Sequence, residues 1–433
     1  MAAVAVWGLS GSLPVIAEDR HNGGEAFVRV SGLIEHLIFD YPGRHESEIR
    51  LVPDGSPPGV MLPEGEGGLM LDFSAKRLAS EAFTQPVSGQ RATVDCVMED
   101  KLCRVVNFEA EKLADDPVVG RSSALWFVVD VRGSQNRYDE KYVAKKMELN
   151  SMWYRKSSYG QMDFPVDSND DGKPDVLRVY LNDVTGPGGC NYRQVATSAK
   201  KIAEQRGYDV KRYEHLVFVL PKLGCRWGGL ANTGCYGRIQ CRAWIASPDW
   251  DMVYPHEIGH NIGMHHASAG SQEYGDGSCP MGNRLKIGFF NGPHTVQMGW
   301  LDEKRGHSKT ITRAGRYQIN ALSSGRRDGE AQVVRFNLGS TKYFMTYRPG
   351  TSFDRVDGEF KKGVNIYSHP GGLSKTRYYL TLAVGRSAGN SQIQLRTISK
   401  DRNKAIVDVS FRRAFADEGS SDGSDPLTLL EED

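Results

Sequence analysis

Residues 254–266 read YPHEIGHNIGMHH, and this stretch decides how the rest of the chain is interpreted. His256 and His260 are four residues apart, a spacing that puts both imidazoles on one face of a helix, about 6 Å from each other. One metal ion can bridge two side chains at that distance. Pro255 is tolerated in the first helical turn, where its missing N–H costs least. We therefore expect the helix to begin near residues 251–253.

The same stretch offers a third ligand and a base. Gly263 lies where the helix must stop, and glycine readily adopts the left-handed conformation of such a stop. The turn can bring His266 back to the metal, and His265, one position short, is the alternative. Three protein ligands leave a fourth position open, which is typical of a catalytic zinc site. Glu257 would take a proton from zinc-bound water, whose pKa the metal lowers to about 7, and pass it to the leaving amine.

The pattern His-Glu-x-x-His-x-x-Gly-x-x-His resembles that of the metzincin zinc peptidases. Metzincins carry a methionine turn beneath the metal, and the resemblance implies that Met281 forms a hydrophobic floor under the histidines; the alternative is a core methionine that fills a gap. A tyrosine that some metzincins place two residues after this methionine is absent, because Asn283 stands there. The surroundings are most similar to the gametolysin family of algal matrix-degrading peptidases, in the order and spacing of residues 158–160, 257–266, 274–276, 279–282 and 298–301.

This resemblance covers residues 150–303 well, the C-terminal region loosely and the first 120 residues hardly at all. It implies a zincin (metzincin) α/β catalytic domain, and the flanking regions alternate short apolar runs with Gly and Pro breaks, as β-rich domains do. We thus expect a multi-domain α+β protein. The expected parts are a signal peptide at 1–17, an N-terminal β-rich domain or pro-segment at 18–120, the catalytic domain at 121–303, a C-terminal β-sandwich-like domain at 304–413 and an acidic disordered tail at 414–433.

The function predicted is a zinc-dependent endopeptidase that hydrolyses peptide bonds of extracellular matrix or cell-wall glycoproteins by Glu-assisted attack of zinc-bound water. Matrix protein as the substrate follows from the family resemblance alone. The alternative is a catalytically inactive, metal-stabilised, matrix-binding relative. An intact Glu257 argues against that alternative, because a binding module does not need the base.

The segment before the active helix resembles the edge strand on which metzincins lay an extended substrate. Gly229, Leu230 and Ala231 are its candidate members, and backbone pairing there would give affinity without sequence selectivity. A Gly-rich loop is the other interpretation.

An acidic segment predicts a second, calcium-type metal site. Oxygen ligands recur at alternate positions in Asp167, Asn169, Asp171 and Asp175, with a glycine for the turn. The twelfth position is Arg178 rather than Glu. An ordinary turn rich in Asn, Asp and Gly is the alternative to a Ca²⁺ site.

Composition restricts partners and compartment. The net charge of +1 comes with no long basic stripe, so nucleic acid is not expected as a partner, and no apolar run is long enough to form a transmembrane segment. Residues 1–17 suit a signal peptide or a retained apolar start. The cysteines contain no Cys-x-x-Cys pair, so disulfides and secretion explain them better than a cysteine zinc site or a reduced intracellular hydrolase.

Two of the cysteines lie in the N-terminal region. If that region is a pro-segment, a thiolate of Cys96 or Cys103 could occupy the open zinc position and keep a zymogen latent. A Cys96–Cys103 disulfide across a short turn is the interpretation we favour. The odd count of seven cysteines leaves at least one thiol unpaired within the chain.

Overall fold

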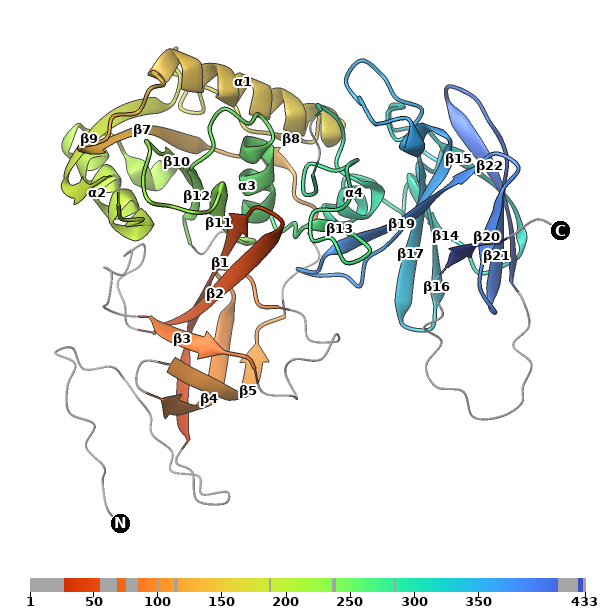
Figure 1. Ribbon diagram of the computed structural model, residues 1–433, viewed down its shortest axis with the longest axis horizontal. Coiled ribbons are helices and arrows are strands. Elements are labelled where there is room, and N and C mark those ends of the chain that lie inside the picture. The colour runs from red at the N-terminus through yellow and green to blue at the C-terminus, as the bar shows by residue number, and fades with distance from the viewer. Residues whose placement is uncertain are drawn as a thin grey trace.

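The computed structural model describes residues 27–54, 68–74, 85–99, 102–112, 116–186, 188–235, 239–283, 286–411 and 427–430. Across these residues the chain is β-rich and multi-sheet, with few helices, in agreement with a multi-domain α+β protein (Figure 1). The predicted signal peptide at 1–17 lies outside the described residues.

The central region is a three-layer α/β arrangement. Its strands run in the order β11-β12-β10-β7-β9, and β11 is antiparallel to β12 whereas the other neighbours are parallel. The strands are β7 (Ala124–Arg132), β9 (Val176–Thr185), β10 (His215–Val219), β11 (Gly229–Asn232) and β12 (Cys241–Ile245). The helices are α1 (Glu140–Ser157), α2 (Tyr192–Gln205), α3 (Val253–Asn261) and α4 (Gly292–Gln297), with short 3₁₀ turns η1 (Val210–Arg212) and η2 (Glu359–Lys361).

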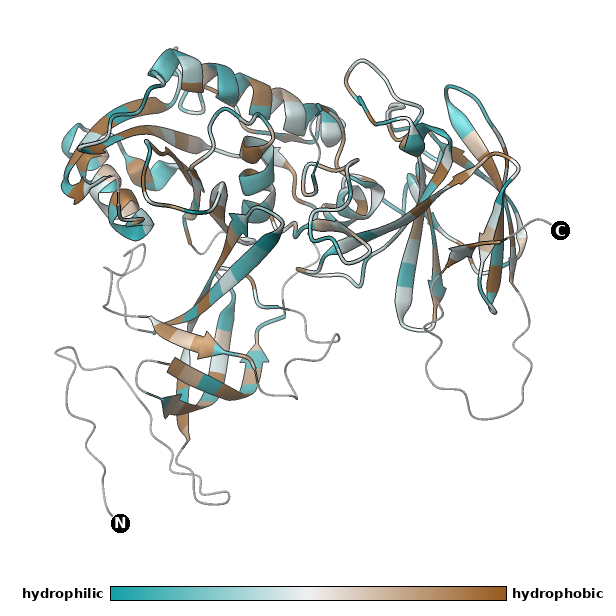
Figure 2. Cartoon of the chain, in the orientation of Figure 1, coloured by the Kyte–Doolittle hydropathy of each residue, from teal (hydrophilic) through white to brown (hydrophobic). Residues whose placement is uncertain are grey.

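Strand β7 shows why this sheet is covered on both faces. Trp126 and Val128 pack into the core that α1 and α3 share, while Leu125, Phe127 and Val129 pack into the core under α2. Successive side chains of a strand point to opposite faces, so a strand buried on both sides is apolar at every position. In Figure 2 the strand is accordingly brown over much of its length, whereas α1 alternates brown with teal.

The N-terminal β region is continuous with this sheet. Strand β1 pairs with β11 and extends the order to β2-β3-β5-β4-β1-β11, which makes a ten-stranded sheet in the described part of the chain. The added strands are β1 (Val28–Tyr41), β2 (Arg44–Pro53), β3 (Leu69–Asp72), β4 (Arg91–Glu99) and β5 (Leu102–Ala110), and β6 (Gly120–Arg121) pairs separately with β8 (Met162–Asp163). The predicted division at residue 120 is therefore crossed by a strand pairing.

The C-terminal region consists of two sheets that share one apolar core. One has the order β13-β19-β18-β17-β16-β14 and the other the order β15-β22-β21-β20-β23. Their bounds are β13 (Ala267–Ala269), β14 (Ser308–Thr310), β15 (Gly315–Asn320), β16 (Val333–Leu338), β17 (Thr341–Tyr347), β18 (Gly363–Ser368), β19 (Thr376–Ala383), β20 (Ser387–Gly389), β21 (Ile393–Lys400), β22 (Lys404–Phe411) and β23 (Thr428–Leu429).

Two details differ from the expected boundaries. Strand β13 lies within the predicted catalytic range yet pairs with β19 of the C-terminal sheet, so the segment after His266 belongs to both regions. Residues 427–430 fall in the predicted disordered tail, but Thr428–Leu429 pairs with β20 and Leu427 is 3% exposed. Burial of Leu427 and the backbone pairing explain the order there; residues 412–426 and 431–433 lie outside the described residues.

The cysteine prediction is confirmed. Disulfides join Cys96 to Cys103, Cys190 to Cys225 and Cys235 to Cys241, which leaves Cys279 as a buried thiol. In the part of the chain that the structure describes, no helix is long and apolar enough to cross a membrane.

Candidate metal centre

Helix α3 presents the two histidines as the spacing predicted. It begins at Val253, within the expected 251–253, and ends at Asn261. Gly263 then has a φ of 99°, and its N–H donates to the His260 carbonyl at 2.9 Å. This positive φ turns the chain so that His266 returns toward the helix. The position requires glycine, because a residue with an L side chain rarely adopts such a conformation.

Three imidazoles converge. The Nε2 atoms of His260 and His266 are 3.1 Å apart, and the ring centroids of His256 lie 4.9 Å from His260 and 5.4 Å from His266. All three side chains are at most 4% exposed. His265, the alternative third ligand, does not belong to the groups of potential ligands found among the described residues; its Nδ1 instead accepts from the His266 N–H.

The opposite nitrogen of each ring is already bonded to oxygen. Nδ1 of His256 lies 2.9 Å from the Pro280 carbonyl, and Nδ1 of His260 lies 2.8 Å from the Met264 carbonyl. Nδ1 of His266 lies 2.6 Å from a carboxylate oxygen of Glu273. Because an oxygen acceptor fixes the proton on Nδ1, each Nε2 carries a lone pair toward the common point, as in metal-binding histidines.

Asp40, from β1, completes the group. Its Oδ2 lies 3.1 Å from Nε2 of His256 and 3.3 Å from Nε2 of His260, and its Oδ1 lies 2.8 Å from Nε2 of His266. A tetrahedron with metal–ligand bonds of about 2.0–2.1 Å separates its corners by roughly 3.3–3.4 Å. The four donors therefore fit a zinc-sized ion after shifts of a few tenths of an ångström.

A second layer of polar groups surrounds the histidines. Glu273 accepts from His266 and also pairs with Lys375 of the C-terminal sandwich and, at 3.0 Å, with His45 of β2. Burial alone would raise the pKa of Glu273, but hydrogen bonds from His266 and His45 and the positive charge nearby lower it. The carboxylate thus stays charged and orients His266.

Glu257 follows His256 in α3, interacts with Asp40 and is 1% exposed. Burial and, after it, the negative charge of Asp40 raise the pKa of Glu257 well above its usual value. The carboxylate fits against the backbone of Gly229 in β11, where an added Cβ would lie 1.8 Å from Oε1 of Glu257. Glycine at this position is what allows the strand and the carboxylate to approach each other.

Met281 lies directly beneath α3. It is fully buried, and a Cβ added to Gly259 would lie 2.5 Å from its sulfur. The preceding residue, Pro280, supplies the carbonyl that orients His256. Arg348 of the sandwich supports the same turn, since its guanidinium donates to the Ser278 carbonyl at 2.7 Å while it pairs with buried Asp354.

The candidate edge strand is β11, which contains Gly229, Leu230 and Ala231 as proposed from the sequence. One side of β11 pairs with β12 and the other with β1. Its outer edge is therefore covered by a strand of this same chain.

The acidic loop is held by its own side chains. Asp167 accepts from the N–H groups of Asp171 and Gly172, and Asn169 accepts from Asp171. Asp175 is 3% exposed, and both of its oxygens already accept protein hydrogen bonds, Oδ2 from Ser168 and Oδ1 from Tyr213. This is the bonding of an Asx turn, and Ca²⁺ binding at Asp167, Asn169, Asp171 and Asp175 stays a prediction.

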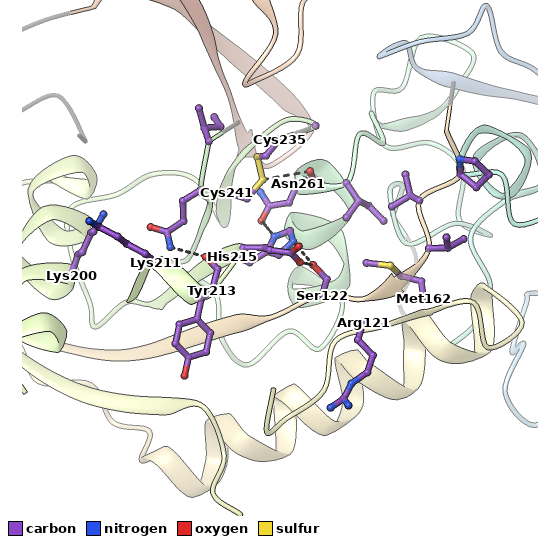
Figure 3. A pocket seen from close by; sticks show the side chains of 18 residues that line it. Arg121, Ser122, Met162, Lys200, Lys211, Tyr213, His215, Cys235, Cys241 and Asn261 are labelled. Carbon is purple, nitrogen blue, oxygen red and sulfur yellow. Dashed lines mark hydrogen bonds between the residues drawn. A yellow bond between two sulfur atoms is a disulfide. The ribbon is translucent and has the colours of Figure 1, made fainter. Parts of the chain in front are cut away.

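A cavity of about 590 Å³ lies elsewhere, and Figure 3 shows the polar groups that line it. Nε2 of His215 lies 3.0 Å from the Ser122 hydroxyl, and its Nδ1 lies 3.1 Å from the Asn261 side-chain oxygen. The Asn261 amide in turn donates to carbonyls of β11 and β12. These bonds tie the end of α3 to the sheet, which is a structural role.

Comparison with known proteins assigns the chain. A model of the gametolysin peptidase M11 family matches residues 142–341, a range that contains His256, Glu257, His260 and His266. Residues 142–341 of the chain are thus a match to the gametolysin family. Autolysin of Chlamydomonas reinhardtii is 31% identical over 97 residues, which are 21% of this chain and 15% of that protein. The match therefore spans a small part of the relative's length.

Two solved structures show only distant likeness. One is titled a chaperone–substrate complex, with 15% identity, a TM-score of 0.27 and coverage of 48% of this chain and 32% of that chain. The other is catalytically inactive OgpA from Akkermansia muciniphila with an O-glycopeptide, with 10% identity, a TM-score of 0.29 and coverage of 66% and 90%. TM-scores this low carry no argument about fold or function.

The sequence had not pointed to Asp40 or Glu273. Asp40 lies outside the family match and 220 residues from His260, so no local pattern announces it. Glu273 follows His266 by only seven residues, and a carboxylate at such a distance could have been examined as the partner of its Nδ1.

Proposed function

We propose that this gametolysin-family peptidase is a secreted zinc-dependent endopeptidase of the metzincin type, acting on proteins or glycoproteins of an extracellular matrix or cell wall. One observation carries the proposal: three buried imidazoles direct Nε2 to a common point while every Nδ1 is engaged by oxygen. That donor set suits Zn²⁺, which prefers three protein ligands in catalytic sites.

His256, His260 and His266 are the proposed ligands. Zinc bound there would supply Lewis acidity to the substrate carbonyl and to water. Burial and the neighbouring imidazoles lower the pKa of His260 to about 4, so this ring is neutral and free to coordinate at neutral pH. Met281 under α3 would fix the height of the helix beneath the metal.

Glu257 is the proposed general base. Its place between the histidines and the backbone of Gly229 puts the carboxylate where a bound peptide and a water would meet. It would take the proton of the attacking water and return it to the leaving nitrogen. Its pKa is raised by burial, which favours accepting that proton at neutral pH.

Tyr274 is the proposed donor to the substrate carbonyl oxygen, the role for which Asn283 is unsuited. Its hydroxyl donates to Oδ1 of Asp40 at 2.8 Å, and its ring lies 4.5 Å from His266. A carboxylate held in this way resembles the carboxyl of a cleaved peptide. A phenol at that place can stabilise negative charge that develops on oxygen during the reaction.

The substrate would bind in extended form along β11. Backbone pairing to an edge strand accepts many sequences, as degradation of a matrix requires. The three disulfides support an oxidising compartment and hence secretion.

The test measures zinc content and casein hydrolysis before and after limited proteolysis of the wild type, Glu257→Gln and His260→Ala. We expect one zinc per chain in the wild type and Glu257→Gln, loss of zinc in His260→Ala, and hydrolysis by the wild type alone. A wild type that holds zinc but hydrolyses no casein, either before or after limited proteolysis, would favour a metal-stabilised matrix-binding relative and would refute the peptidase.

A further inference from the structure

The hairpin formed by β1 and β2 has a narrow tip that reaches toward the metal centre. Tyr41 pairs with Arg44 across the two-residue turn Pro42-Gly43, and Gly43 has a φ of 78°. Proline followed by a glycine with positive φ is the arrangement of a type II turn, which holds the tip narrow. Figure 1 shows this tip reaching from the N-terminal sheet toward α3.

The tip places a carboxylate at the fourth corner of the metal centre. Both oxygens of Asp40 are within 3.3 Å of a histidine Nε2, and the side chain is 11% exposed. The residues flanking Asp40 hold it in place. His45 pairs with Glu273, and the hydroxyl of Tyr274, which donates to Asp40, also lies 3.0 Å from the Arg44 carbonyl.

The backbone of the same strand covers the substrate edge. Leu37, Ile38, Phe39 and Asp40 of β1 lie opposite Asn232, Ala231, Leu230 and Gly229 of β11 in an antiparallel ladder. The N–H of Gly228 donates to the Asp40 carbonyl at 2.8 Å, which continues the ladder past the strand end. An extended peptide could not pair with β11 while β1 is present.

Buried charges fasten the hairpin to the peptidase. Glu35 of β1 is paired with Arg193 of α2 and Arg242 of β12, and each of these side chains is at most 10% exposed. Arg193 also pairs with Glu48 of β2, and the ring of Phe39 meets Tyr192 edge-on at 5.5 Å. A contact with this much buried complementarity is a docked interface.

We propose that the N-terminal β region is a built-in inhibitor that keeps the peptidase latent, with the Asp40 carboxylate as fourth metal ligand and β1 in the place of the substrate. The inference rests on the proposed function for the metal, and it concerns residues outside the family match. A thiolate of Cys96 or Cys103, the other candidate for the open metal position, is excluded, because both cysteines are fully buried and form a disulfide with each other.

The experiment compares the full chain with Asp40→Ala, Asp40→Asn and Glu46→Gln, each loaded with Co²⁺ or Zn²⁺. Glu46 is the matched control, because it is an exposed carboxylate of the same hairpin that pairs with Arg44. The Co²⁺ visible spectrum reports the ligand set, and calorimetry with acetohydroxamate, a small metal ligand, reports access to the fourth position. Asp40→Asn keeps the side-chain shape should Asp40→Ala fold poorly.

We expect the Co²⁺ spectrum to change in both Asp40 variants and acetohydroxamate to bind at least tenfold more tightly than to the wild type or Glu46→Gln. Equal spectra and equal affinities in all four proteins would refute the role of Asp40 while leaving the zinc peptidase intact. A wild type that binds no Co²⁺ would overturn the proposed function and this inference together.

Discussion

The buried ion pairs of Glu35 with Arg193 and Arg242, called the Glu35 clamp below, offer a way to weaken docking of the β1–β2 hairpin without changing a proposed metal ligand. Glu35→Gln keeps the size of the side chain and removes its charge. Arg242 then loses its carboxylate partner, whereas Arg193 keeps Glu48. Breaking a buried ion pair by removing one partner costs about 3–5 kcal/mol.

The lower end of that range applies, because the glutamine carbonyl can still accept one hydrogen bond and one arginine stays paired. A loss of about 3 kcal/mol corresponds to roughly a hundredfold change in the docking equilibrium, at about 1.4 kcal/mol per factor of ten. We expect the amides of Leu37–Asp40 and of their partners in β11 to exchange with solvent roughly a hundredfold faster in Glu35→Gln.

Hydrogen exchange with mass spectrometry measures this directly, with Glu46→Gln as the control. A peptide-based hydroxamate, which needs both the metal and the β11 edge, should also bind Glu35→Gln more tightly. Unchanged exchange in β1 would refute the idea that the buried charges hold the hairpin. Equally faster exchange in β7 and β10 would mean that the variant unfolds as a whole.

Lowering the pH should also weaken the Glu35 clamp, because protonation removes the charge of Glu35. Burial alone would raise the pKa of Glu35, but Arg242 and Arg193, with a smaller contribution from Arg50, lower it below its usual value. A carboxyl whose pKa is depressed on docking stabilises the docked state above its undocked pKa, about 4.3, and loses that contribution as pH falls through its docked pKa. Glu48 is a second carboxylate on Arg193, so the diagnostic quantity is the difference in stability of docking between the wild type and Glu35→Gln, which should shrink below about pH 4.

Three further outcomes follow. Gly263→Ala should cost about 1–3 kcal/mol in the free energy of unfolding, because alanine is strained at a positive φ, and denaturant melts with and without zinc would detect the accompanying loss of metal affinity. Glu273→Gln should weaken zinc binding roughly 10–100-fold in a competition assay with a chromophoric chelator, because His266 loses its carboxylate partner. Arg348→Met should lower stability by about 3–5 kcal/mol, since it removes the guanidinium that compensates the buried charge of Asp354; Arg348→Met with Asp354→Leu should recover part of the loss.

The sequence could predict those parts of the site that depend on residues only a few positions apart. Helical spacing places His256 next to His260, and a glycine at the required offset returns His266, so α3 begins where expected. The strand at Ala124–Arg132 is also encoded locally, because a strand that is buried on both faces is apolar at nearly every position. Such features depend on residues a few positions apart.

Features that depend on pairing between distant segments could not be predicted. The ladder between β1 and β11 joins segments almost 200 residues apart, and the apolar run at 37–39 alone does not say which edge it will cover. Asp40 had no signal either, since a lone aspartate before a Pro-Gly turn is ordinary turn composition. The strand at β13 was missed for the same reason, as its partner β19 lies about a hundred residues further on.

The geometry also indicates how the hairpin could be removed. A segment tethered to its own binding site has an effective concentration in the millimolar range for short linkers, and here buried charge pairs and strand pairing add to that advantage. A substrate strand in solution would need to exceed this concentration while forming the same backbone bonds to β11. Displacement by substrate alone is therefore disfavoured, and cleavage of the chain between β5 and β7 followed by dissociation of the N-terminal β region is the route that the structure favours. If so, limited proteolysis in that connection should raise casein hydrolysis by the wild type and by Asp40→Ala alike, because β1 covers β11 in both until the N-terminal β region dissociates.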